Sequence, residues 1–306
     1  MTRIANRILC AALFAATLPF ASAVAGPQED YVAARDKAIA DSIAAAKAQK
    51  SGDDAVIKRE EAARKDLAKK LAAALGPLKF KGLGGPEYSL QLFIYDESAP
   101  TRQLDGLAFA SKDYSTRLVV APESQFQAWL AARAKDPEAP AALAGGVKPA
   151  MTTSEFYGDA LGFENGYFQP YIDLPVTAPP GETAFAVLGQ QLDDVSGNSA
   201  PNELFIVRIA DGKAIVGVTG AKLAINKPIP ACDAVWKPFK AKADALQKQV
   251  EKDNKNEDPR WEEITKIQDE GSVAYRACFA KEAPAQPFFA AAVKKAEAFL
   301  ATTRGQ

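Results

Sequence analysis

The chain has 306 residues, with 37 basic and 38 acidic side chains and no histidine. Because the two charges are nearly equal in number, the chain lacks the excess of basic residues that is typical of nucleic-acid binding. The absence of histidine excludes Ser-His-Asp and Cys-His mechanisms, together with histidine-based zinc or copper sites.

The first 25 residues are typical of a cleavable secretory signal. Arg3 and Arg7 precede an apolar run over 8–20, and small residues suited to cleavage after Ala23 or Ala25 follow it. That run is shorter than the roughly 20 apolar residues that a membrane-spanning helix needs. We therefore expect a soluble protein that is exported to a bacterial periplasm and has no transmembrane anchor.

Helical spacing governs residues 27–75. Apolar residues recur at intervals of four, as in Leu67, Leu71 and Leu75, and a Ser-Gly-Asp-Asp break at 51–54 divides the stretch. This pattern predicts a helical arm made of two antiparallel helices. We favour packing of the arm on the protein's own sheet; the alternative is self-association or partner binding through these helices.

The region 78–230 is predicted to be mainly antiparallel β structure with short helices, because its apolar residues alternate with period two. Asp211-Gly212 joins two strand-like runs and suits a type I′ hairpin turn, in which both residues need a positive φ. Both faces of 204–209 are largely apolar, so this strand is expected in the interior of the sheet, covered on both sides. A short amphipathic helix is expected to present Phe126, Trp129 and Leu130 on one side.

The region 231–306 is predicted to be helical, with an antiparallel hairpin followed by a final helix. Cys10 leaves with the signal, so Cys232 and Cys278 are the cysteines of the mature chain. The first begins one helix of the hairpin and the second lies near the end of the other, so antiparallel folding brings them together. In an oxidising compartment such a pair indicates a structural disulfide.

The aromatic stretch 156–173 contains the candidate ligand-binding residues. These are Tyr157, Glu164, Tyr167, Tyr171 and Asp173. Aromatic faces beside carboxylates suit a sugar or peptide groove, and paired carboxylates can cleave a glycosidic bond without histidine. The alternative, which we favour, is that the aromatic side chains fill the core beneath a hairpin whose turn carries Asn165-Gly166.

The expected fold is α+β: antiparallel sheet(s) with an N-terminal helical arm, a C-terminal antiparallel helical hairpin and a final helix. No catalytic residue, metal site or cofactor is expected, since nucleophile, phosphate-binding and dinucleotide motifs are missing from the sequence. We expect a non-catalytic binding or structural protein of the cell envelope, whose ligand or protein partner is unknown. Two alternatives stay open: a carboxylate-based hydrolase of envelope glycan, and an inhibitor or chaperone-like protein that binds partners through its terminal helices.

Overall fold

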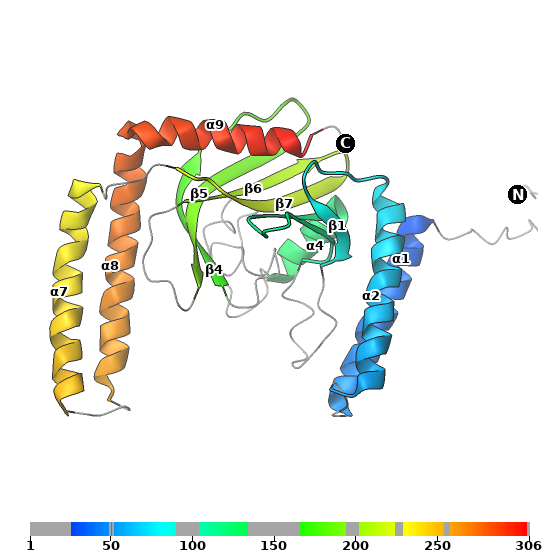
Figure 1. The fold of residues 1–306 in the computed structure, drawn as a ribbon, viewed down its shortest axis with the longest axis horizontal. Coiled ribbons are helices and arrows are strands. Elements are labelled where there is room, and N and C mark those ends of the chain that lie inside the picture. The colour runs from blue at the N-terminus through cyan, green and yellow to red at the C-terminus, as the bar shows by residue number, and fades with distance from the viewer. Residues whose placement is uncertain are drawn as a thin grey trace, which may run out of the picture.

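A computed structural model describes residues 26–48, 50, 52–89, 104–133, 166–193, 202–223, 229–253 and 258–304. Within these ranges, seven strands form one antiparallel sheet that is flanked by helices (Figure 1). The strands are β1 (Gly84–Tyr88), β2 (Leu107–Ala110), β3 (Thr116–Pro122), β4 (Gly166–Leu174), β5 (Thr183–Asp193), β6 (Glu203–Ala210) and β7 (Lys213–Gly220). The α-helices are α1 (Pro27–Lys47), α2 (Asp54–Leu75), α4 (Glu123–Arg133), α7 (Pro230–Asp253), α8 (Arg260–Glu282) and α9 (Pro287–Thr302). The predicted α+β class is confirmed.

The β6–β7 hairpin lies at the middle of the sheet, whose strand order is β1-β2-β3-β7-β6-β5-β4. Asp211 (φ 52°) and Gly212 (φ 69°) adopt the left-handed conformations that the predicted type I′ turn requires. Side chains on both faces of β6 are buried, because Ile206 joins the core on one face and Val207 joins the core on the other. The prediction of an interior strand covered on both sides is confirmed.

Helices α9 and α4 cover opposite faces of this sheet (Figure 1). Phe299 of α9 belongs to one core, and Phe126 and Trp129 of α4 belong to the other, as the helical spacing predicts. The Phe299 ring of α9 reaches β7 at Gly217, where an added Cβ would lie 3.2 Å from Cζ of Phe299 and 2.3 Å from Cδ2 of Leu118. Glycine at this position therefore leaves the space that the Phe299 ring fills.

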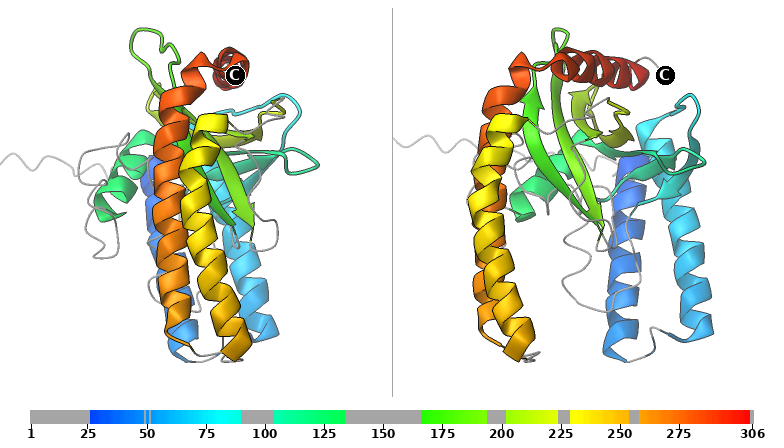
Figure 2. Two further views of the ribbon diagram at one scale, coloured as in Figure 1. Left: turned by 90° about the vertical axis from the view of Figure 1, so that its left-hand side faces the viewer. Right: turned by 60° about the vertical axis from the view of Figure 1, so that its left-hand side comes forward.

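The N-terminal hairpin of α1 and α2 packs at the β1 edge of the sheet. Asp53 caps α2 by accepting a hydrogen bond of 2.8 Å from the backbone of Ala55. Leu67, Leu71 and Leu75 of α2 are buried in the core that also contains side chains of β1, β2 and β3. This half of the arm packs on the protein's own sheet, while the other half extends beyond it (Figure 2).

The C-terminal hairpin of α7 and α8 is closed at its base by the predicted disulfide. The Cα atoms of Cys232 and Cys278 lie 5.4 Å apart and their sulfurs are bonded. Farther from the sheet, the two helices share a small core of their own, made of Ala243, Val250, Ile264 and Ile267. The disulfide predicted from export, cysteine count and helix register is confirmed.

The two helical hairpins extend in the same direction from opposite edges of the sheet (Figures 1 and 2). Helix α2 packs beside edge strand β1, and α8 packs beside edge strand β4. At the usual spacing of about 4.8 Å, seven strands place the two edges roughly 30 Å apart. Among the described helices, none is long and apolar enough to span a membrane.

Candidate functional site

The predicted aromatic and acidic site is only partly within the described residues. Tyr157 and Glu164 lie outside them, and of Tyr167 only the backbone, in β4, is described. The ring of Tyr171 packs edge-on against α8, with its centroid 5.3 Å from that of Phe279. Asp173 is exposed. The structure thus places Tyr171 in the packing between β4 and α8, and the five-residue binding site stays a prediction.

A β-bulge explains why Tyr171 points at the helix. Pro170 pairs with Gly189 and Ile172 pairs with Leu188, so Tyr171 has no residue opposite it. Tyr171 and Ile172 consequently both pack against the same core. Burial raises the pKa of Tyr171 to about 12, so its hydroxyl is neutral. The hydroxyl donates a 3.3 Å hydrogen bond to Oε1 of Gln190.

A cluster of buried polar side chains, which we call the arm joint, fastens α1 to the sheet. Asp105 accepts hydrogen bonds from the hydroxyl of Tyr31 and from Nε of Arg35. The Tyr31 hydroxyl also lies 3.3 Å from the hydroxyl of Tyr88. Burial first, and then the Asp105 charge, raise the pKa of both tyrosines well above the usual value. Because the tyrosines stay neutral and both carboxylate oxygens accept hydrogen bonds, the role of the arm joint is to hold α1 against the sheet.

A second ion pair, between buried Arg208 and half-buried Glu182, holds the end of α9. Arg208 of β6 binds both carboxylate oxygens of Glu182, at 3.1 and 2.7 Å, and donates a 2.8 Å hydrogen bond to the carbonyl of Thr303. Arg304 adds a 3.1 Å contact to Glu182. These bonds, led by those from Arg208, lower the pKa of Glu182 to about 2. Residues from β6, the loop before β5 and the C-terminal end of α9 are thereby held together.

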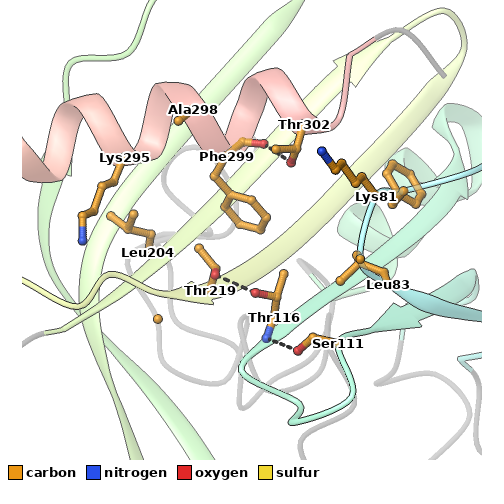
Figure 3. A pocket seen from close by; sticks show the side chains of 13 residues that line it. Lys81, Leu83, Ser111, Thr116, Leu204, Thr219, Lys295, Ala298, Phe299 and Thr302 are labelled. Atoms are coloured by element: carbon orange, nitrogen blue, oxygen red, sulfur yellow. Dashed lines mark hydrogen bonds between the residues drawn. The ribbon is translucent and has the colours of Figure 1, made fainter.

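A groove of about 410 Å³ lies between α9 and the end of the sheet where β3 begins and β7 ends (Figure 3). We call it the α9 groove. Its lining residues are Phe80, Lys81, Gly82, Leu83, Ser111, Thr116, Leu204, Thr219, Gly220, Lys295, Ala298, Phe299 and Thr302. Apolar side chains form its floor, whereas hydroxyl groups and two lysines surround them. Such a volume and mixed lining are within the range of small-molecule sites.

The surfaces of the helical hairpins carry a second feature that could serve binding. Five large apolar side chains are exposed among the described residues, and four of them lie on the hairpins: Val32, Val235, Trp261 and Val273, the fifth being Tyr114 in the β2–β3 turn. Single exposed apolar residues are common on protein surfaces. One of the four lies on the α1–α2 hairpin and three lie on the α7–α8 hairpin, so both hairpins carry exposed apolar side chains that a partner could contact.

Sequence reasoning did not find the α9 groove or the arm joint. The groove draws its lining from segments between Phe80 and Thr302, and Asp105 lies 74 residues from Tyr31 in the chain. Neither constellation contains a local motif, so both depend on the sheet and helices being assembled first. Across the described ranges, no group of three or more Cys, Asp or Glu side chains is arranged to hold a metal ion.

The chain was also compared with known proteins. No protein-family model, no curated protein and no solved structure matches this chain.

Proposed function

We propose that this chain is an exported, non-catalytic protein of the bacterial cell envelope that binds a protein partner through its two helical hairpins. The observation that carries the proposal is the arrangement of the hairpins. They extend in the same direction from opposite edges of one sheet and bear four of the five exposed large apolar side chains of the described residues. A partner that contacts the exposed positions of these helices would bury these side chains.

The attachment of the hairpins supports this role. The arm joint fastens α1 to the sheet through Asp105, and the disulfide and the Tyr171–Phe279 contact lie where the α7–α8 hairpin meets the sheet. Fixed attachment reduces the conformational entropy that the protein loses when it binds. Two fixed arms can therefore present a pre-formed contact surface.

Export is the second part of the proposal, and it is tested by the mature N-terminus. The signal-like segment ends at Ala23 or Ala25, just before helix α1 begins at Pro27. Protein recovered from the periplasm should begin at Val24 or Gly26, as read by intact mass. Recovery of full-length protein from the cytoplasm alone would contradict export.

Partner binding is tested with matched surface variants. Immobilised mature protein should retain an envelope protein, and the double variant Val235→Ser, Val273→Ser should lose most of that binding. Tyr114→Ser is the control, because Tyr114 is more exposed (68%) than either valine but lies in the β2–β3 turn. Equal loss in the control would contradict the assignment of the surface to the hairpins.

The hydrolase alternative makes an opposite prediction. Two carboxylates, Glu164 and Asp173, were candidates for cleavage of envelope glycan. The binding proposal expects no turnover of peptidoglycan or chitin oligomers by the purified protein. Turnover that disappears in Glu164→Gln or Asp173→Asn would overturn it.

A further inference from the structure

We propose that the α9 groove is a binding site for a small organic anion with an apolar body. This inference is independent of the partner-binding role of the hairpins, which lie at the edges of the sheet. It concerns the face of the sheet that α9 covers.

The charge of the lining selects an anion. Lys81 and Lys295 are both among the lining residues, and the lining contains no carboxylate. No other described residue forms a hydrogen bond or ion pair with Lys81. Its side chain extends toward the end of α9 that carries Thr302 (Figure 3). Within the described part of the chain nothing competes for the ammonium group, which can pair with a carboxylate or sulfonate in the groove.

Two further donors face the same space. The hydroxyls of Thr116 and Thr219 lie 2.7 Å apart and share a single hydrogen bond. Because each hydroxyl has one proton, one of the two protons stays available for a ligand. Lys295 uses two of its protons on the carbonyls of Ala221 and Lys222, which leaves it one more.

The floor selects the body of the ligand. Phe299, Phe80 and Leu204 line the groove, and each is at most 7% exposed. An apolar body placed on them would cover the small part of each side chain that the groove leaves exposed. A ligand with no apolar part would gain only the polar contacts, which compete with water.

The groove is formed before a ligand arrives, because α9 is held at two points. Lys295, in the middle of the helix, binds the backbone after β7, and Arg208 binds the carbonyl of Thr303 at its C-terminal end. A fixed wall lowers the ordering cost of binding. The site thus has the rigidity that specific recognition of a small molecule needs.

Isothermal titration calorimetry of the mature protein tests this site with three probes. These are 2-naphthoate, octanoate and the uncharged analogue 2-naphthalenemethanol. We expect saturable binding of at least one carboxylate and at least tenfold weaker binding of the alcohol. Binding of naphthoate alone would assign an aromatic body, and binding of octanoate alone an aliphatic one.

Matched variants locate the binding. Lys81→Gln should weaken carboxylate binding about tenfold, since it removes a charge-assisted contact. Thr219→Val, which keeps the shape but removes a hydroxyl, should weaken it severalfold. Lys112→Gln changes the same charge beside lining residue Ser111 but outside the lining, and should change affinity less than twofold. Equal binding by Lys81→Gln and wild type, equal binding of the alcohol, or no binding of either carboxylate at millimolar concentration would overturn the proposal.

Discussion

Arg35 binds two carboxylates that differ in burial, and this difference determines how much each contributes to the stability of the fold. The Asp105 side chain is 8% exposed and also accepts the Tyr31 hydroxyl, whereas the Asp36 side chain is 64% exposed. If a buried carboxylate with two charged or polar partners is replaced by a neutral group, those partners lose part of their hydrogen bonding. An exposed pair is screened by water.

Asp105→Asn should therefore lower the free energy of unfolding by about 2–4 kcal/mol. Asp36→Asn, which removes the exposed partner of the same guanidinium, should change it by less than about 1 kcal/mol. The midpoint of urea unfolding, followed by circular dichroism, measures both. Similar losses in the two variants would show that the arm joint does not stabilise the fold.

The pKa of Glu182 predicts how the stability of the fold depends on pH. Its pKa falls from the usual 4.5 to about 2 through hydrogen bonds from Arg208 and then Arg304. A group whose pKa is lower in the folded state stabilises the protein above the unfolded pKa and loses this effect as pH falls toward the folded pKa. The melting temperature of the wild type should thus fall as the pH is lowered from 4.5 to about 2.

Glu182→Gln is the matched variant for this measurement. It should be less stable than the wild type at pH 7, and the gap between the two proteins should close as pH is lowered toward 2. A gap that stays constant across this range would mean that the Arg208–Glu182 pair contributes no pH-dependent stability.

At the scale of elements, the disulfide at the base of the α7–α8 hairpin closes a long loop. Cys232 and Cys278 are 46 residues apart, and closing such a loop removes about 4 kcal/mol of unfolded-state entropy in the chain-entropy description. Cys278→Ser should lower the melting temperature. The double variant Cys232→Ser, Cys278→Ser should lower it by a similar amount. Denatured, unreduced protein should titrate with no free thiol; two free thiols would contradict the bond.

The packing of α7 on α8 depends on a glycine inside a helix. An added Cβ at Gly271 would lie 2.4 Å from Cζ3 of Trp236 and 2.8 Å from Cβ of Phe239. Alanine is favoured over glycine in helices by about 1 kcal/mol, but this contact distance forces the hairpin apart. Gly271→Ala should destabilise the wild type, and should destabilise a Trp236→Ala variant by less, because only the contact with Cβ of Phe239 then remains. Equal effects in both backgrounds would rule out the contact.

Much of the element structure was predictable because its signals are local. Asp211-Gly212 has the turn chemistry of a type I′ hairpin, and the spacing of Leu67, Leu71 and Leu75 marks a helical face. The register of two helices of similar length brought Cys232 and Cys278 together. Each of these predictions needed only neighbours within one or two elements.

The remaining features depend on contacts between distant segments. Period-two alternation does not reveal a bulge, so the direction of Tyr171 toward α8 was not predictable. Asp105 precedes an ordinary strand, and nothing near it indicates Tyr31 as its partner. The α9 groove likewise depends on how α9 packs on the sheet, with the Phe299 ring against Gly217 of β7. For the candidate site, sequence supplied residue types but not their arrangement.

At the scale of the molecule, the sheet acts as a spacer between two helical hairpins. The seven strands set the separation of the hairpins, and contacts at the base of each hairpin hold it against the sheet. Helix α7 has 24 residues, so its arm is about 36 Å long. This frame is large enough to contact a folded domain on two sides.

Site-specific photo-cross-linking in intact cells tests the partner-binding role most directly. A photoreactive amino acid would replace Val32 on α1, Val273 on α8 or, as the control, Tyr114 in the β2–β3 turn, all of which are exposed. The account predicts that both hairpin positions form adducts with the same envelope protein and that position 114 does not. Absence of adducts at both hairpin positions, or the same adduct at position 114, would contradict it.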